Sequence, residues 1–277
     1  MKILTTRTLT MPAIGLGTWP MKGAECEAAI ASALAMGYRH IDTAEMYGNE
    51  AEVGRALAET AVPREDIFLT TKGWWDKPDG PALRAACEAS LERLKTPYLD
   101  LYLIHWPSAQ LNLASAMEGL ARIQADGLAR AVGVANFPPG LLSRALALGI
   151  APLACNQVEH HLLLPQAPLL KICAAHDMVL TSYSPLGKGC VPAHPALAPI
   201  AARHGVTPAQ VALAWALAQG PGGKMVSAIP KAASAARQAE NLAAADLTLD
   251  AADMAAIAAI TTRRRFVNPA FAPDWAA

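Results

Sequence analysis

Short apolar segments alternate with longer amphipathic segments along almost the whole chain of 277 residues. The short segments are continuous apolar runs, which is typical of parallel strands that are buried on both faces. The longer segments place apolar residues at the spacing of a helix with one buried face. This pattern predicts eight strands, over residues 14–18, 38–41, 67–71, 99–104, 131–135, 153–158, 179–183 and 226–229.

The order of these segments predicts an α/β fold. Strands that alternate with helices favour a parallel sheet, and eight of them favour closure into a (β/α)8 TIM barrel. The interval before the eighth strand is long enough for two helices, and a further helix follows near the C-terminus. The predicted helices cover residues 25–36, 50–59, 81–94, 114–126, 141–148, 166–176, 195–203, 208–218, 233–242 and 251–260.

Two segments lie outside this repeat. Residues 1–10 alternate apolar and polar side chains, which predicts a small N-terminal β-hairpin. The segment after Thr261 contains an arginine triplet followed by prolines and a tryptophan, and we expect an irregular extension there. Because no stretch rich in Gly, Ser or Pro divides the chain, we expect one barrel domain over residues 1–277.

Composition narrows the class of partner. Lys+Arg and Asp+Glu number 23 each, so no overall charge favours nucleic acid or an anionic membrane. The apolar runs are too short or too broken to span a bilayer, and the N-terminus lacks the apolar core of a signal peptide. The five scattered cysteines include no CxxC pair, which favours a reducing compartment over a disulfide framework or zinc site. We expect a cytoplasmic protein that acts on a small molecule.

Polar side chains recur at the carboxyl ends of the predicted strands. In a parallel barrel these ends meet at one rim, where active sites are built. Asp42 follows the second strand, Lys72 the third and His105 the fourth, and Tyr47 lies in the loop after Asp42. The later strands add further polar residues at the same level: Asn136, Gln157, Tyr183 and Lys231.

Each of the first four residues also has an ordinary structural interpretation. Asp42 could cap a helix or close an Asx turn, Lys72 could be solvated, and His105 could be a satisfied core histidine. Tyr47 could be a rim aromatic. The combination of Asp, Tyr, Lys and His at the ends of three successive strands favours a shared site instead.

These four residues suit the transfer of a proton to oxygen. A tyrosine of pKa about 10 is a poor acid at neutral pH. A nearby ammonium group, here Lys72, stabilises the phenolate and lowers that pKa, and a carboxylate such as Asp42 fixes the ammonium group. His105 can orient a substrate oxygen by a hydrogen bond. Such a group of side chains could protonate a carbonyl oxygen as a hydride arrives at its carbon.

The hydride must come from a cofactor, because no side chain carries one. The segment GLGTWP breaks the GxGxxG fingerprint at its last position, so we expect a nicotinamide site on the barrel rim. Asn136 and Gln157 are candidates to hold the carboxamide, and Tyr183 is a candidate to stack on the nicotinamide ring. Lys231 and Arg237 could bind a phosphate, although they could equally belong to a solvated helix face.

A series of motifs follows one order along nearly the whole chain. They are GLGTW from Gly15, DTAEMYGNE from Asp42, TK from Thr71, LIHWP from Leu103, GVANF from Gly133, NQVE from Asn156, SYSPLG from Ser182, IPK from Ile229 and RQAEN from Arg237. Together they resemble the aldo-keto reductase family, in particular its bacterial branch of 2,5-diketogluconate and methylglyoxal reductases.

The resemblance implies a (β/α)8 barrel that binds NADPH in extended form at the rim. It implies a catalytic tetrad of Asp42, Tyr47, Lys72 and His105, with Tyr47 as proton donor and no metal. It implies a substrate site formed by Trp19, Tyr47, Trp74, His105 and Trp106, although Trp74 and Trp106 could instead serve barrel packing. The implied cofactor contacts are Gly17, Thr18, Asp42, Asn136, Gln157, Tyr183, Ser184, Leu186, Gly187, Lys231, Ser234, Arg237, Glu240 and Asn241.

Some positions depart from the family pattern. Ala135 stands where the family usually has Ser, which removes one carboxamide contact. Ala232 also stands where Ser is common, which removes a hydroxyl from the phosphate site, and Ser234 is a candidate replacement. NADPH therefore remains the expected cofactor, with NADH left open. His160 and His161 are unusual neighbours, but adjacent strand residues point to opposite faces, so we do not expect them to share a metal ion.

We therefore expect a monomeric NADPH-dependent oxidoreductase that reduces aldehydes and ketones, such as 2-oxoaldehydes or diketo sugars, to alcohols. Two other functions stay open. Lys72 could form a Schiff base in a lyase, although an ion pair with Asp42 would keep its amine protonated. The barrel could also be a non-catalytic NADPH-binding sensor, because a fold does not determine a function.

Overall fold

A parallel eight-stranded sheet organises the computed structural model, which describes residues 2–276. Met1 and Ala277, the outermost residues of the predicted hairpin and barrel domain, lie outside the described residues. The strand order is β10-β9-β8-β7-β6-β5-β4-β3. These strands are β3 (Leu16–Gly17), β4 (His40–Asp42), β5 (Phe68–Gly73), β6 (Leu99–Ile104), β7 (Ala129–Ala135), β8 (Leu153–Glu159), β9 (Val179–Tyr183) and β10 (Val226–Ala228).

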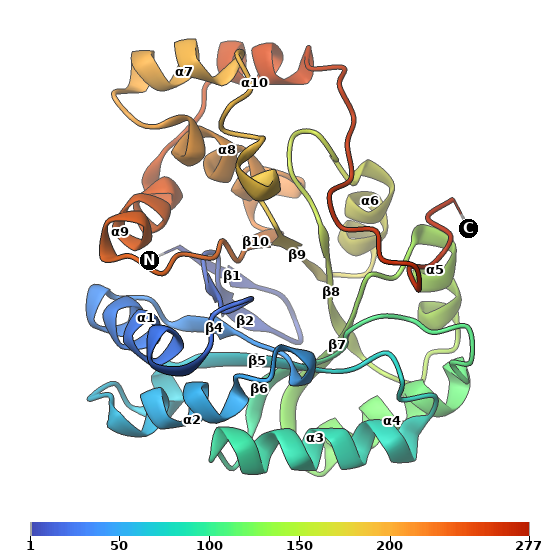
Figure 1. The fold of residues 1–277 in the computed structure, drawn as a ribbon. Coiled ribbons are helices and arrows are strands. Elements are labelled where there is room, and N and C mark those ends of the chain that lie inside the picture. Colours follow the sequence, from blue (N-terminus) through green and yellow to red (C-terminus); the bar gives the residue numbers. More distant parts are fainter. Residues whose placement is uncertain (1, 277) are drawn as a thin grey trace.

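The sheet closes on itself between its first and last strands. The Gly15 amide donates to the Ala228 carbonyl at 2.9 Å, and the Ala228 amide donates to the Ala13 carbonyl at 2.8 Å. Ile14 and Ala228 form a parallel bridge at the same place. Closure removes the sheet edges, and it confirms the predicted (β/α)8 barrel (Figure 1). Of the predicted strand over residues 14–18, only β3 and this bridge are observed, because the first and last strands of the barrel pair over a short stretch.

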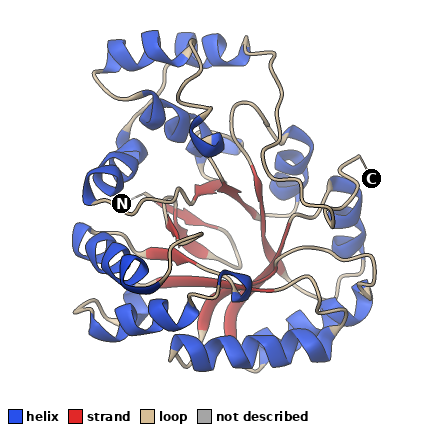
Figure 2. Ribbon diagram, in the orientation of Figure 1, coloured by secondary structure: helices blue, strands red, loops and turns tan. Residues whose placement is uncertain are grey.

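Helices surround the barrel, as Figure 2 shows in blue around the red strands. Those adjoining the sheet are α1 (Gly23–Met36), α2 (Glu50–Glu59), α3 (Gly80–Leu94), α4 (Leu113–Ala125), α5 (Pro139–Ala147), α6 (Ala167–Ala175), α8 (Pro208–Leu217) and α9 (Ala235–Ala243). Short 3-10 turns are η1 (Glu45–Tyr47), η2 (Arg64–Asp66), η3 (Gly187–Gly189), η4 (Pro221–Gly223) and η5 (Ala244–Asp246). Within residues 2–276, no helix combines the length and apolar character needed to cross a bilayer.

The predicted extra helices form a second layer outside α8. They are α7 (Leu197–His204) and α10 (Ala251–Ala258). Ile200 of α7, Trp215 of α8 and Ile257 of α10 belong to one buried apolar cluster, separate from the barrel core. This second core explains why the interval between β9 and β10 holds two helices: α8 covers the barrel, and α7 covers α8 (Figure 1).

The N-terminal hairpin is also present. Its strands β1 (Ile3–Thr5) and β2 (Thr10–Pro12) pair antiparallel, with Ile3 opposite Pro12. Leu4 and Met11 are buried. The hairpin shares a groove with Phe68 at the start of β5, so it covers the amino end of the barrel, away from the carboxyl ends of the strands.

Two strands begin and end later than the sequence predicts: β4 covers His40–Asp42 where residues 38–41 were predicted, and β5 covers Phe68–Gly73 where residues 67–71 were predicted. Asp42 is the last residue of β4, and Lys72 lies within β5, so neither residue belongs to a loop. Their exposed fractions are 1% and 0%. The barrel therefore holds both charges inside its mouth, where water cannot solvate them.

Burial also keeps His160 uncharged. Its ring stacks on Trp215 with centroids 5.2 Å apart, and neither ring nitrogen has a hydrogen-bond partner within the described chain. Burial lowers the pKa of His160 to about 3, whereas histidine in an unfolded chain has a pKa of about 6.5. Below about pH 6.5 the unfolded state binds the extra proton, so His160 makes folding less stable as the pH falls from about 6.5 towards about 3.

Replacing this histidine should weaken the pH dependence of stability. One such group costs about 1.4 kcal/mol per pH unit, or about 2 kcal/mol between about pH 6.5 and about pH 5. Urea unfolding at about pH 7 and about pH 5 should show a loss of stability that is smaller by that amount in His160→Leu. His176→Leu, at an exposed position, is the control. Equal losses in wild type and His160→Leu would contradict the assignment.

Candidate active site

A cleft of about 460 Å³ opens at the carboxyl ends of the strands. Its lining combines aromatic rings with polar side chains, as is usual for small-molecule sites. Many of the predicted site residues line it: Gly17, Thr18, Trp19, Asp42, Tyr47, Trp74, His105, Trp106, Asn136, Gln157, Tyr183, Ser184 and Lys231. The barrel thus brings together residues from nearly every part of the chain.

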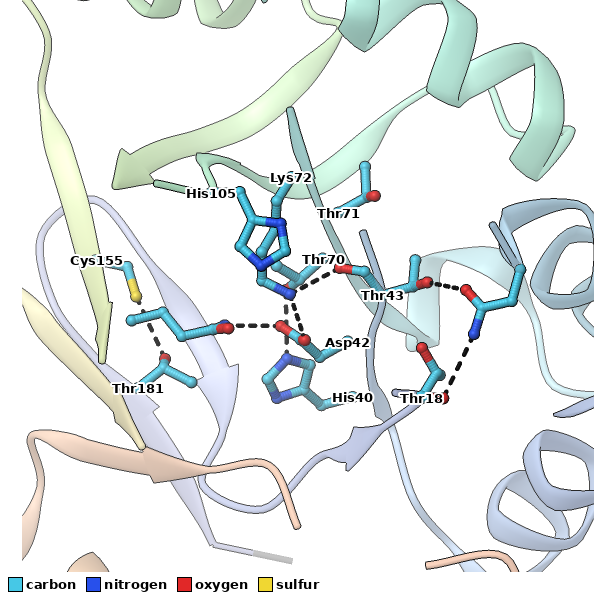
Figure 3. Close-up of polar contacts among 12 residues, drawn as sticks. Thr18, His40, Asp42, Thr43, Thr70, Thr71, Lys72, His105, Cys155 and Thr181 are labelled. Atoms are coloured by element: carbon cyan, nitrogen blue, oxygen red, sulfur yellow. Dashed lines mark hydrogen bonds and ion pairs between the residues drawn. The ribbon is translucent and has the colours of Figure 1, made fainter. Parts of the chain in front are cut away.

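A buried ion pair forms the floor of this cleft. The Lys72 Nζ donates to Asp42 Oδ1 at 2.5 Å and to the Thr43 carbonyl at 2.8 Å (Figure 3). The Gln157 amide donates to Asp42 Oδ2 at 2.7 Å, so both carboxylate oxygens are satisfied. Burial raises the pKa of Asp42 and lowers the pKa of Lys72, and the attraction between the two charges opposes both shifts.

A second set of contacts holds the strand that carries Lys72. The hydroxyl of Thr71 donates to the buried carboxylate of Glu50 at 2.5 Å, and Arg93 Nε donates to the same carboxylate at 2.7 Å. Below the ion pair, His40 Nε2 lies 3.3 Å from the Thr70 hydroxyl. Burial, and then the charge of Lys72, lowers the pKa of His40 to about 3. The ion pair therefore lies above a neutral ring.

Tyr47 reaches the cleft from the short turn η1. Gly48 ends this turn with a φ of 60°, in the left-handed region that glycine adopts without strain. Asn49 then accepts from the Thr43 hydroxyl at 2.7 Å and donates to the Met21 carbonyl at 2.9 Å. The turn is therefore tied to the chain on both sides, which fixes Tyr47 with its ring centroid 5.1 Å from Lys72 Nζ.

The acidity of Tyr47 differs from the sequence-based expectation. Although the side chain is half-buried, desolvation and then the charge of Asp42 raise its pKa well above 10. We predicted that Lys72 lowers this pKa, and the raised pKa shows that this prediction is wrong. The reason is that burial removes water from the phenol, and the negative charge of Asp42 disfavours the phenolate further. The phenol is therefore protonated at neutral pH.

His105 faces Tyr47 across the cleft. Its ring meets the Tyr47 ring edge-on with centroids 5.6 Å apart, and the Trp74 ring at 5.1 Å. Burial, and then Lys72, lowers the pKa of His105 well below 6.5, so the imidazole is neutral at pH 7. Asn136 donates to the His105 carbonyl at 2.9 Å and accepts from the Tyr183 hydroxyl at 2.8 Å. These bonds join β7 and β9 to the loop after β6.

The remaining predicted site residues do not line the cleft. Lys72 lies beneath the lining, in its floor. Ser234 and Arg237 are exposed at the start of α9, while Glu240 accepts from the Thr207 hydroxyl. The predicted residues outside the lining, apart from Lys72, are Leu186, Gly187, Ser234, Arg237, Glu240 and Asn241.

Sequence reasoning missed the contribution of the C-terminal segment. From this segment, the lining includes Phe266, Val267, Asn268, Pro269 and Phe271, none of which was predicted. Three other residues of the lining were also not predicted: Met46, Lys188 and Ile229. Phe271 stacks on Trp75 with centroids 5.2 Å apart and meets Trp74 edge-on at 5.4 Å. The one local signal was the concentration of aromatic residues in a segment with no helical or strand period. Such residues are rarely left in solvent.

Comparison with known proteins matches the chain to one family. The Aldo/keto reductase family model matches residues 13–262. An aldo-keto reductase of Mycolicibacterium smegmatis is 42% identical over 258 residues, which cover 92% of each chain. The methylglyoxal reductase DkgB of Salmonella typhimurium is 40% identical over 271 residues, which cover 96% of this chain and 100% of that protein.

Solved structures agree with this match. A crystal structure described as a 2,5-diketo-D-gluconic acid reductase B superposes with a TM-score of 0.92 at 40% identity, covering 100% of this chain and 98% of that one. An aldo-keto reductase complexed with NADPH has a TM-score of 0.89 at 31% identity, covering 98% and 92%. The chain therefore belongs to the aldo-keto reductase family, whose members are oxidoreductases that reduce carbonyl compounds with a nicotinamide cofactor.

Breaking the buried ion pair should cost more stability than removing it. Asp42→Ala leaves Lys72 buried without its partner, which should cost about 3–5 kcal/mol. The double variant Asp42→Ala/Lys72→Met should recover part of this loss, because methionine fills the space without a charge. Urea unfolding of the wild type, Asp42→Ala, Lys72→Met and the double variant measures the coupling energy in a double-mutant cycle. A coupling energy near zero would show that the two charges do not stabilise one another.

Proposed function

We propose that this protein reduces a small aldehyde or ketone to an alcohol with NADPH, and that Asp42, Tyr47, Lys72 and His105 are its catalytic residues. One observation carries the proposal: a buried ion pair lies directly beneath a protonated phenol and a neutral imidazole, all at one cleft. The names of two relatives, methylglyoxal reductase and 2,5-diketo-D-gluconic acid reductase, support 2-oxoaldehydes or diketo sugars as the substrate class.

Tyr47 is the proposed proton donor. Its raised pKa keeps the proton on the phenol until the reaction begins. Neutral His105 holds the substrate carbonyl beside Tyr47 by a hydrogen bond. As negative charge develops on the carbonyl oxygen, the phenol proton moves to it. The phenolate that remains is stabilised by the Lys72 ammonium group, which Asp42 keeps in place, and then takes a proton from water.

The residues of the cleft fit a nicotinamide cofactor, which supplies the hydride when bound. The Tyr183 ring offers a stacking surface, and Asn136 and Gln157 offer amide groups beside it. The Thr18 hydroxyl is buried in the lining and has no hydrogen-bond partner within residues 2–276. An orphaned hydroxyl at this position suits a polar ligand group.

A phosphate site is proposed at the end of the cleft. Lys231 lines the cleft, and α9 begins a few residues later, with exposed Ser234 at its N-cap and exposed Arg237 in its first turn. A helix N-terminus with nearby cations suits a phosphate anion. Ala232 is buried and brings no hydroxyl to this site. NADPH is therefore the proposed cofactor, with some use of NADH.

The Schiff-base lyase alternative is less well supported. Lys72 is fully buried, and its Nζ donates to Asp42 and to the Thr43 carbonyl. A Schiff base at this nitrogen keeps at most one N–H, so at least one of these bonds would be lost.

The direct test of reduction is to mix protein, NADPH and a panel of aldehydes that includes methylglyoxal and an aromatic aldehyde. We expect loss of the reduced-nicotinamide absorbance, and no turnover across the panel would refute the proposal.

Tyr47→Phe should separate catalysis from binding. Without the phenol proton, kcat/KM should fall about 10²–10⁴-fold, the usual contribution of a general acid. NADPH affinity, measured by fluorescence titration, should stay within about twofold, because the ring remains. Tyr98→Phe, where the ring lies between Arg64 and Arg130, is the matched control. Undiminished turnover in Tyr47→Phe would mean that another group is the donor.

Lys231→Ala and Arg237→Ala should each weaken NADPH binding more than NADH binding. A hydrogen bond to a charged phosphate contributes about 1.5–3 kcal/mol, so the ratio of the two Kd values should shift roughly 10–100-fold. Parallel titrations with both cofactors measure this ratio. Lys224→Ala, at another exposed lysine, should leave the ratio unchanged. A similar loss of affinity for both cofactors would argue that neither residue binds the phosphate that NADPH carries and NADH lacks.

A further inference from the structure

The last residue of β8, Glu159, is a fully buried carboxylate outside the proposed catalytic group. The Phe266 amide donates to its Oε1 at 2.7 Å, and the Val267 amide donates to its Oε2 at 2.9 Å. His161 Nε2 lies 2.9 Å from Oε1. A buried carboxylate is costly unless hydrogen bonds replace its water. Here the two hydrogen bonds come from the backbone amides of residues that lie more than a hundred positions further along the chain.

The same two residues begin the part of the C-terminal segment that lines the cleft. The Phe266 ring packs directly on Gly187, where an added Cβ would lie 2.8 Å from the ring. Just before it, the Arg264 amide donates to the Leu163 carbonyl at 2.8 Å. Lys188 donates to the Phe266 carbonyl at 3.1 Å, but this bond is exposed. Glu159 therefore provides a buried side-chain attachment for the segment, in addition to the backbone bond at Arg264.

Beyond this attachment the segment crosses to the opposite wall of the cleft. Phe271 packs among Trp74, Trp75 and Trp106, with ring centroids 5.4, 5.2 and 5.6 Å away. Trp275 continues the contact at 6.0 Å from Trp106. The segment has neither helix nor strand, so its position depends on contacts such as those with the carboxylate of Glu159 at one end and with the aromatic cluster at the other.

We propose that Glu159 is a positioning residue that latches residues 264–271 over the cleft, and that this latch selects carbonyl compounds with an aromatic or extended apolar substituent. The Trp74 ring contacts both His105 and Phe271, with centroids 5.1 and 5.4 Å away, so we expect a three-carbon substrate held by Tyr47 and His105 not to depend on Phe271. A substrate with an aromatic ring extends to Trp106 and Phe271, and it needs the segment in place to complete its binding surface. The selectivity rests on the proposed carbonyl reduction, whereas the latch itself does not.

Glu159→Gln tests the selectivity. An amide can accept from one tail N–H but turns a donor towards the other, so the latch loses a charged hydrogen bond. We expect KM for 4-nitrobenzaldehyde to rise about tenfold or more, with kcat changed little. The kcat/KM for methylglyoxal and the Kd for NADPH should stay within about twofold. Glu118→Gln, at an exposed position on α4, is the control. Equal losses for both aldehydes, or weakened NADPH binding, would overturn the proposal.

Hydrogen exchange tests the latch without any turnover. In the wild type, the Phe266 and Val267 amides should be protected, and Glu159→Gln should speed their exchange about tenfold or more without affecting α3. Unchanged exchange would overturn the latch, even if the wild type reduces no aldehyde and the proposed function fails. Should Glu159→Gln not fold, Phe271→Ala replaces it. That variant should raise KM for 4-nitrobenzaldehyde while both amides stay protected, and an unchanged KM would overturn the selectivity.

Discussion

The buried ion pair between Lys72 and Asp42 is the constraint on which the rest of the site depends. Desolvating two charges costs several kcal/mol per ion, and this cost is offset only when hydrogen bonds replace the lost water. The carboxylate therefore needs Gln157 from β8, and the ammonium group needs the Thr43 carbonyl after β4. An open sheet could not supply these partners from both sides. The closed barrel does so because its strands converge around one axis.

The ion pair also decides the protonation of the groups above it. Burial, and then the negative charge of Asp42, raises the pKa of Tyr47, so its phenol holds its proton. His105 is neutral because burial, and then the positive charge of Lys72, lowers its pKa. A protonated phenol beside a neutral imidazole is a suitable resting state for an acid that acts only when charge appears on a bound oxygen. This arrangement supports the reductase proposal more directly than family likeness alone.

The other half of the cleft depends on a segment without secondary structure. Glu159 holds Phe266 and Val267 by their amides, and Phe271 completes an aromatic wall with Trp74 and Trp106. Phe266 also contacts Gly187, in the loop after β9 where cofactor contacts are proposed. The barrel thus provides a rigid floor, and the C-terminal segment provides a wall whose position rests on a few contacts. Chemistry and substrate choice are accordingly assigned to different parts of the molecule.

The sequence by itself determined the barrel and the residues at its rim. A continuous apolar run followed by a helical period is a local signal, and parallel closure places every strand end at the same rim, so Asp42, Lys72 and His105 had to lie close together. Only the tertiary structure decided how deeply Asp42, Lys72 and Tyr47 are buried, and therefore the direction of the pKa shift of Tyr47. It alone placed Phe271 in the cleft, because a segment without a period is positioned by contacts such as Glu159 with Phe266, 107 residues apart. Desolvation and long-range contacts are properties of the folded arrangement, and no local pattern encodes them.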